Sequence, residues 1–341
     1  MSAQKNRPTQ RTIADRLGIS VGAVSRALAN DVKMSEQTRA QVRKAAEDLG
    51  YAPDRAAQRL RTGRTFVINL ILPPHNEILG FGNLLVGGIS AGLLGTPFDL
   101  LVWPDHGADQ SLDRIERIVR NNLADGIIFS RTCPDDSRIR FLSEAGFPFV
   151  THGRSELATP HAFVDFDNQA FGKQAAELLI ARGAKRLAIL LPEDRFMFHH
   201  HLLHGFMTAV RVAGVDHEIL SGMTLDSDGH DISKQLGKRL QAANAPDGLI
   251  FPGDVSALAG LAAIQDAGLI VGRDVHVVVK QTSGVFDFVR PRVDSLHEDL
   301  SAAGRSLAQM IIDRINGVPA ADLQLVHPAM TAPTQTSVTT G

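Results

Sequence analysis

Apolar residues recur at helical spacing near the start of the chain. In TQRTIADRLGISVGAVSRAL (residues 9–28) they form one face of a predicted helix that ends at Gly18, a residue suited to a sharp helix stop. Ser20 follows as an N-cap for a second helix, in which Val24 and Leu28 lie on the buried side. A short helix, a glycine-containing turn and a second helix are typical of the helix-turn-helix motif.

A third helix is predicted over residues 35–49, where the apolar residues share one stripe and Gly50 stops the run. Residues 53–64 follow as a short helix and linker. A helix this short is marginal in water unless it packs on something. Leu60 is its apolar residue between two arginines, a pattern typical of side chains that enter minor-groove base steps. The alternative is a plain interdomain linker.

Beyond residue 64 short apolar runs alternate with helical runs, which predicts parallel sheets with helices between the strands. The ligands of such folds lie beyond the carboxyl ends of the strands, here in a cleft between two doubly wound lobes. The predicted strands are 66–72, 99–103, 126–130, 148–151, 186–191, 248–251 and 275–279. The predicted helices include 111–121, 168–182, 204–213, 233–243 and 255–267.

Composition narrows the class of protein. The 341 residues are 44% hydrophobic and 21% charged, an ordinary globular balance, and no run approaches the length of a membrane span. The polar start predicts no secretory signal, and the single cysteine, Cys133, excludes an intrachain disulfide, so we expect a cytoplasmic protein. Residues 1–64 hold 13 Lys and Arg against 6 Asp and Glu, whereas the remainder carries 22 against 31. A basic head on an acidic body indicates a polyanion partner for the head.

Residues 9 to about 336 resemble the LacI/GalR family of transcriptional regulators. The motifs that carry the resemblance are TIADRLGISVGAVSRAL and MSEQTRAQVRKAAEDLGYAPDRAAQRLRTG, followed by an α/β core like that of periplasmic binding proteins. The resemblance implies a homodimer with its two heads in adjacent major grooves of a palindromic operator DNA. It also implies that residues 54–60 form a hinge helix that folds on DNA and inserts Leu60.

The candidate DNA-binding residues lie mostly on the second predicted helix. A recognition helix presents its first residues to base edges, and Arg26 suits a bidentate contact to guanine. The resemblance implies that Val21 and Gly22 set operator preference. It also implies that phosphate or the helix frame is held by Thr9, Ser20, Ser25, Thr38 and Arg39. The full set is Thr9, Ser20, Val21, Gly22, Ser25, Arg26, Thr38, Arg39, Arg55 and Leu60.

The resemblance also implies three crossings between the lobes. The expected domains are 1–52 for the head, 53–64 for the hinge, 65–165 with 296–321 for lobe 1, 166–292 with 322–336 for lobe 2, and 337–341 for a tail. The low-complexity tail lacks heptads, which favours a dimer over a tetramer.

Strand ends and family positions together select the candidate effector residues. They are Phe81, Ser130, Arg131, His152, Arg154, Asp167, His201, Asp254, Lys280, Gln281 and Glu298. The family's effector-binding arginine, three residues before Gly205, is replaced here by Leu202, so a neighbouring histidine is expected to take over. A metal site on the three consecutive histidines is the alternative, but no carboxylate partner has matching spacing and no metal is expected.

The arginines, histidines and lysine of this set predict an anionic or highly polar, carbohydrate-like effector. In the alternative they pair with Glu298, Asp254 and Asp167. We therefore expect a repressor whose operator affinity is controlled by this effector. The rival is a cytoplasmic sugar-binding or sugar-modifying α/β protein. The basic head and the missing secretory signal argue against a transport protein. No dinucleotide, P-loop or nucleophile-elbow motif is present, so neither catalysis nor a cofactor is expected.

Overall fold

The computed structural model describes residues 8–51, 59, 62–73, 79–104 and 108–331. The chain divides into two compact units, Met1–Thr65 and Phe66–Gly341, and each is described by itself. The predicted hinge residues Arg55 and Leu60 lie outside the described residues, as does the tail.

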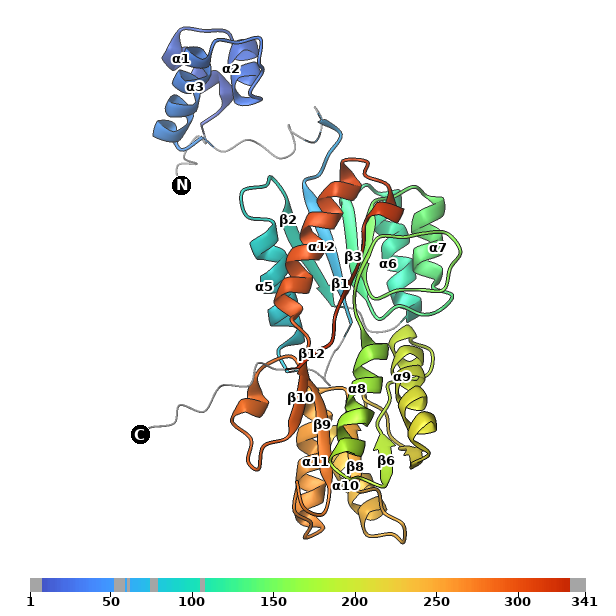
Figure 1. Ribbon diagram of the computed structural model, residues 1–341. Coiled ribbons are helices and arrows are strands. Elements are labelled where there is room, and N and C mark those ends of the chain that lie inside the picture. The colour runs from blue at the N-terminus through green and yellow to red at the C-terminus, as the bar shows by residue number, and fades with distance from the viewer. Residues whose placement is uncertain (1–7, 52–58, 60–61, 74–78, 105–107, 332–341) are drawn as a thin grey trace, which may run out of the picture. The chain divides into compact units, whose positions relative to one another are not determined.

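In its described residues the first unit is a head of three helices, α1 (Gln10–Leu17), α2 (Val21–Leu28) and α3 (Glu36–Leu49) (Figure 1). Ile13, Val24 and Val42, one from each helix, are fully buried against one another. Gly18 ends α1 in the left-handed conformation, with φ 67°, so the chain can turn at once into α2. The predicted helix-turn-helix is confirmed.

The second unit contains two α/β lobes, each built on a six-stranded sheet (Figure 1). In the first lobe the strand order is β11-β5-β4-β3-β1-β2. Its strands are β1 (Val67–Leu72), β2 (Asp99–Pro104), β3 (Gly126–Ser130), β4 (Phe149–His152), β5 (Phe163–Phe166) and β11 (Gln324–His327). Helices α5 (Phe81–Gly92) and α12 (Leu300–Ile315) cover one face; α6 (Ala108–Arg120) and α7 (Ser137–Glu144) cover the other.

The second lobe repeats this plan with the order β12-β10-β9-β8-β6-β7. Its strands are β6 (Arg186–Ile189), β7 (Asp216–Ile219), β8 (Gly248–Phe251), β9 (His276–Gln281), β10 (Asp294–His297) and β12 (Met330–Thr331). Helices α8 (Asn168–Ala181) and α9 (Met197–Ala213) pack on one face; α10 (Gly229–Leu240) and α11 (Asp254–Asp266) pack on the other. Two short 3-10 helices, Val285–Asp287 and Ala320–Asp322, complete the described elements. Among the described strands every pairing is parallel except β10 with β12, as the two buried sheets predict.

One segment differs from the expected lobe boundaries. Residues 322–336 were assigned to the second lobe, but β11 pairs with β5 in the first sheet. The chain therefore returns to the second lobe only after His327. The pattern of apolar residues does not show which of the two sheets a terminal strand joins, because the strand would bury the same side chains at the edge of either sheet.

Glycines bring paired helices into backbone contact in both lobes. A Cβ at Gly205 of α9 would lie 2.0 Å from the Gln169 carbonyl oxygen of α8, and one at Gly172 would lie 2.5 Å from the Leu202 carbonyl oxygen. In the first lobe a Cβ at Gly88 of α5 would come within 2.4 Å of a carbonyl oxygen of α12. Each lobe thus contains one helix pair that excludes any side chain at its crossing point.

The contact between α8 and α9 can be tested with Gly205→Ala. We expect the free energy of unfolding to fall by about 1–3 kcal/mol, because the added methyl group forces two packed helices apart. Urea denaturation of the full chain measures this. Gly237→Ala is the matched control, since that glycine also lies within a helix but a Cβ there meets nothing within 4 Å. The control should gain about 0.5–1 kcal/mol from helix propensity, and equal losses in both variants would contradict the packing argument.

Candidate functional sites in the head and the interlobe cleft

Helix α2 of the head turns one face to solvent. Val24 is buried, whereas Val21 is 44% exposed and Gly22 and Arg26 are exposed beside it. Ser25 lies on the same helix and is half-buried. The exposed face combines one apolar side chain, one bare backbone position and one guanidinium, which are chemically suited to base edges and phosphates.

The other candidate DNA contacts build the frame of the head. Thr9 and Ser20 accept hydrogen bonds from backbone N–H groups in the first turns of α1 and α2. Thr38 shares a 2.8 Å hydrogen bond with the N-cap serine of α3. Arg39 donates to the Asn30 side chain at 3.2 Å, which ties α3 to the end of α2. In the structure these four residues hold the helices in place.

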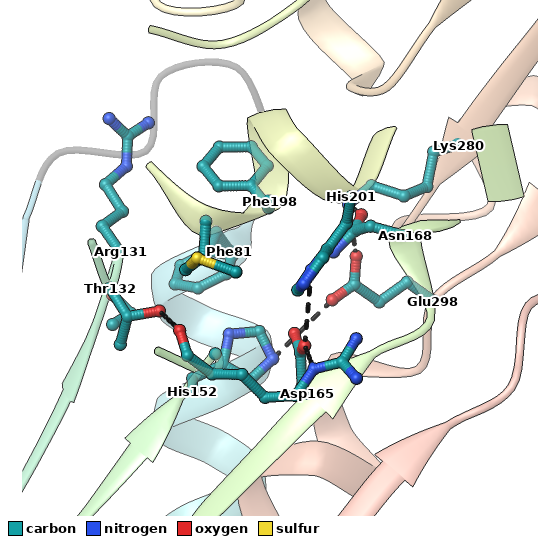
Figure 2. Close-up of a pocket in the computed structure, with 14 residues that line it drawn as sticks. Phe81, Arg131, Thr132, His152, Asp165, Asn168, Phe198, His201, Lys280 and Glu298 are labelled. Carbon is teal, nitrogen blue, oxygen red and sulfur yellow. Dashed lines mark hydrogen bonds and ion pairs between the residues drawn. The ribbon is translucent and has the colours of Figure 1, made fainter. Parts of the chain in front are cut away.

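A pocket lies between the two lobes, where strands of both sheets reach their carboxyl ends; its empty space, including the part open to solvent, is about 530 Å³ (Figure 2). The first lobe contributes Phe81, Ser130, Arg131, Thr132, His152, Gly153, Arg154 and Asp165, and the second lobe and the crossing after β10 contribute Asn168, Met197, Phe198, His201, Lys280 and Glu298.

Ion pairs neutralise the cations of the pocket. Arg154 Nε lies 2.6 Å from Asp165 Oδ2, and Lys280 Nζ lies 2.8 Å from Glu298 Oε2. Lys280 also donates to Asn168 Oδ1 at 3.2 Å. The Lys280 and Glu298 side chains are only 5% and 6% exposed, so each depends on the other for compensation of its charge.

Arg131 is paired as well, with a carboxylate of the opposite lobe. Its guanidinium forms an ion pair with Asp226, and both side chains are largely buried. Each of the three Arg and Lys side chains that line the pocket therefore faces a carboxylate. The cations are thus paired, as in the alternative, but of the three acids expected there only Glu298 takes part, and the other two partners are Asp165 and Asp226.

Burial and charge set the protonation states in the pocket. Burial alone would raise the pKa of Glu298, but Lys280 and His152 outweigh it and hold that pKa below its usual value. Burial lowers the pKa of His152, although its Nε2 lies 3.7 Å from Glu298 Oε1. Burial also lowers the pKa of His201, whose Nδ1 lies 4.0 Å from Asp165 Oδ2. At neutral pH the pocket thus combines ionised carboxylates with uncharged imidazoles.

Eight of the eleven candidate effector residues line the pocket, namely Phe81, Ser130, Arg131, His152, Arg154, His201, Lys280 and Glu298. The remaining three are placed elsewhere. Asp167 caps α8 by accepting from the Ala170 N–H at 2.9 Å. Asp254 is fully buried and accepts from Thr282 Oγ1 at 2.7 Å, while burial raises its pKa. Gln281 follows Lys280 in β9, and successive side chains of a strand point to opposite faces.

Six pocket residues were absent from the candidate set: Thr132, Gly153, Asp165, Asn168, Met197 and Phe198. Capping chemistry would have found two of them. An aspartate before a helix is used as its N-cap, which assigns Asp167 to α8 and leaves Asp165 and Asn168 for the cleft. The helix expected at 204–213 begins seven residues earlier, at Met197. The sequence gives no capping signal for this start, because the N-cap position is Phe196, which makes no side-chain cap. That extension brings Met197 and Phe198 to the pocket.

Leu202 stands where the family resemblance implies an arginine, and its side chain does not reach the pocket. It is fully buried in the core between α8 and α9, while His201, one residue earlier, reaches the pocket. His199 Nδ1 instead bonds the Pro192 carbonyl at 2.7 Å. Within the described part of the chain, no three His, Cys, Asp or Glu side chains gather in a way that would hold a metal ion. No helix there combines the length and apolar character that crossing a membrane requires.

A helix-turn-helix head joined to a two-lobed core with a polar pocket between the lobes is the architecture of a DNA-binding regulator with a ligand-binding domain. Comparison with known proteins gives the family. Residues 9–54 match the model for bacterial regulatory proteins of the lacI family, and residues 176–336 match the periplasmic binding protein-like domain. The chain belongs to the LacI family of transcriptional regulators, so it is a regulator and not an enzyme.

Three similar proteins span nearly the whole chain. The regulator RafR of Escherichia coli is 30% identical over 327 residues, which are 92% of this chain and 94% of the relative. The regulator CelR of Thermobifida fusca is 29% identical over 333 residues, 95% and 96% of the two chains. The solved structure of a CelR–cellobiose complex is 26% identical with a TM-score of 0.69, and the match covers 96% and 99% of the two chains. The fold is also that of the Lac repressor dimer bound to operator, at a TM-score of 0.79, 19% identity and coverage of 96% and 98%.

The buried imidazole of His152 predicts a pH dependence of stability. Its pKa is lowered in the folded state, so below about pH 6.5 the unfolded chain binds a proton that the folded chain does not. The free energy of unfolding should therefore decrease as the pH is lowered below about 6.5. His152 should contribute at most about 1.4 kcal/mol per pH unit to this decrease. Urea midpoints between pH 7.5 and 5.5 should therefore decline less steeply in His152→Gln than in the unmodified protein. The exposed His230, changed to Gln, serves as the control. Parallel curves for His152→Gln and the unmodified protein would refute the assignment.

Proposed function

We propose that this chain is a homodimeric repressor whose affinity for operator DNA is set by a neutral carbohydrate bound in the interlobe cleft. The observation that carries the proposal is the pairing of charge in the pocket. Arg131, Arg154 and Lys280 each have a carboxylate partner. An anionic effector would have to break such a pair and leave a buried carboxylate uncompensated, at a cost of several kcal/mol. A neutral ligand leaves all three intact.

The lining of the pocket fits the chemistry of sugars. A sugar hydroxyl both donates and accepts, and the pocket offers carboxylate acceptors, guanidinium and amide donors, and imidazoles that can do either. The Phe81 ring lies beside His152, with centroids 6.0 Å apart, and Phe198 lines the same pocket as Asp165 and Glu298 (Figure 2). The aromatic rings suit the C–H face of a sugar ring, and the polar groups suit its hydroxyls. The cellobiose complex of the CelR structure supports the same ligand class.

Control of DNA binding then follows from linkage. A ligand held by both lobes favours the arrangement in which the lobes bind it best, and changes operator affinity if the two lobe arrangements differ in that affinity. The coupling free energy in such systems is typically about 1–3 kcal/mol. In the head, Val21, Gly22 and Arg26 are the residues that we propose contact base edges. A dimer places two such heads on a palindromic operator.

The ligand class can be tested by thermal melting of the full chain with neutral disaccharides, sugar acids and sugar phosphates. A ligand at one hundred times its dissociation constant stabilises by about 2.7 kcal/mol, which gives a clear shift. We expect neutral disaccharides, cellobiose first, to raise the melting temperature, and Asp165→Asn to reduce the shift. Lys173→Gln, a change at an exposed lysine paired within its own helix, is the control. A shift produced only by acidic or phosphorylated compounds would refute a neutral effector.

The recognition helix can be tested with Arg26→Ala. Loss of a bidentate contact should cost about 1–3 kcal/mol of operator binding and relax preference at one base pair per half-site. Binding to a randomised operator library at fixed salt measures both effects. The control is Arg16→Ala, because Arg16 lies on α1 and pairs with Asp48 at 3.3 Å. If base preference is unchanged in Arg26→Ala, Arg26 does not read sequence.

A further inference from the structure

The segment that follows β3 has an unusual backbone. Arg131 adopts φ 56°, in the left-handed region that side chains other than glycine seldom occupy. Such a conformation persists only where surrounding contacts enforce it, and it is enriched at functional positions. The neighbours of Arg131, Ser130 and Thr132, line the pocket with it. The contacts that hold this segment therefore bear on the site.

Contacts to the second lobe hold one side of the segment. Arg131 pairs with Asp226, and the two side chains are only 11% and 20% exposed. The guanidinium also lies 5.1 Å from the centroid of the Phe196 ring. One residue later, the Thr132 carbonyl accepts a hydrogen bond from the Met197 N–H at 2.9 Å. Three separate contacts thus join the two lobes within two consecutive residues.

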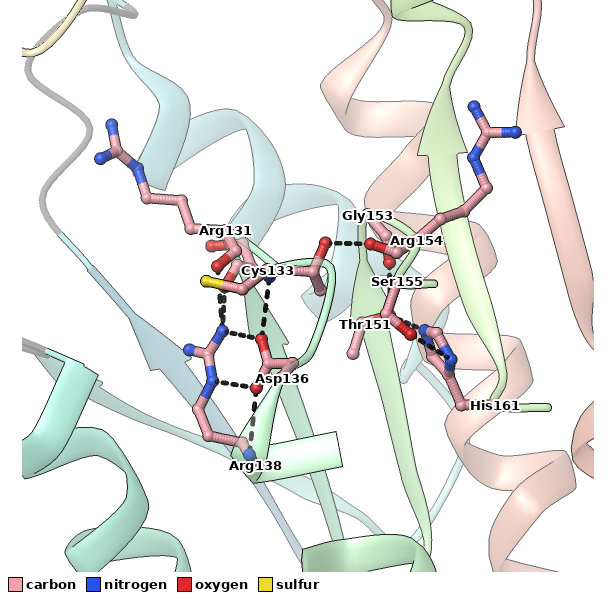
Figure 3. A network of polar contacts seen from close by, with 11 residues as sticks. Arg131, Cys133, Asp136, Arg138, Thr151, Gly153, Arg154, Ser155 and His161 are labelled. Carbon is pink, nitrogen blue, oxygen red and sulfur yellow. Dashed lines mark hydrogen bonds and ion pairs between the residues drawn. The ribbon is translucent and has the colours of Figure 1, made fainter. Parts of the chain in front are cut away.

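Contacts within the first lobe hold the other side. Arg138 donates to the Arg131 carbonyl oxygen at 2.9 Å and pairs with Asp136 at 2.7 Å (Figure 3). Asp136 in turn accepts from the Cys133 N–H at 3.1 Å. Arg138 is buried and lies over the Phe129 ring at 4.5 Å. The segment is therefore fixed to the first lobe. The contact of Arg131 with the second lobe is thereby connected to the body of the first lobe.

We propose that the Arg131–Asp226 pair is an interlobe clasp that sets the fraction of molecules whose lobes are arranged to bind the effector. The proposal rests on the proposed function and adds how the same site is regulated. Apparent affinity equals intrinsic affinity multiplied by the competent fraction. Loss of the clasp therefore lowers the competent fraction and raises the apparent dissociation constant for the effector by the same factor. Asp226 does not line the pocket, so it is a positioning residue that acts through Arg131.

The test compares Asp226→Asn, Arg131→Gln and the double variant in the full chain. Each single variant should raise the dissociation constant for cellobiose about tenfold, as for loss of a largely buried pair. The double variant should show no further loss, because both changes break the same interaction. A second readout needs no ligand. Hydrogen exchange at the Met197 amide should accelerate about tenfold in Asp226→Asn, while the Ala170 amide, capped within its own lobe, stays protected.

Arg195→Gln is the matched control. Arg195 lies over the same Phe196 ring at 4.5 Å, but it pairs with Glu193 of its own lobe. It should leave both the dissociation constant and the Met197 exchange unchanged. Unchanged exchange in Asp226→Asn, or losses that add in the double variant, would overturn the clasp. If no carbohydrate binds the unmodified protein, the proposed ligand class fails, and the exchange measurement still decides the clasp.

Discussion

Charge removed from water must be compensated, and this constraint organises the cleft. Lys280 is the penultimate residue of β9, Glu298 follows β10, and Asn168 begins α8, so the ion pair with its amide contact joins three elements of the second lobe at one crossing. His152, from the end of β4, brings the first lobe to the same carboxylate. The lobes therefore meet at a buried polar cluster whose members cannot be removed singly without exposing the others to an apolar surrounding.

Much of the architecture could be predicted because its signals are local. Caps, glycine stops and apolar periodicity lie within a few residues of one another, so the helices of the head and most buried strands are readable in the chain. Pairings between distant residues are not. Asp226 is 95 positions from Arg131, and β11 joins β5 across most of the second lobe. At the site itself, a difference of one or two positions decides which residue faces the cavity, as with Lys280 and Gln281.

The replacement at Leu202 changes how α9 serves the site. The residue packs into the core, and the pocket is served from the first turns of the same helix by Met197, Phe198 and His201. In place of the arginine that the family resemblance implies, α9 presents the imidazole of His201 and the apolar side chains of Met197 and Phe198 to the pocket. An uncharged imidazole can donate or accept a hydrogen bond according to its tautomer, whereas a guanidinium can only donate.

The glycine contacts of the paired helices have a mechanical consequence. Gly88 and Gly304 join α5 to α12, and Gly172 and Gly205 join α8 to α9, at distances that leave no room for sliding. Such contacts stiffen each lobe at its helix pair, and the chain passes between the two lobes after β5, β10 and β11, so a rotation of one lobe against the other would use these three crossings as flexures. In a body of this kind displacement grows with distance from the flexures. A small rotation at the pocket becomes a larger travel at the far ends of the lobes.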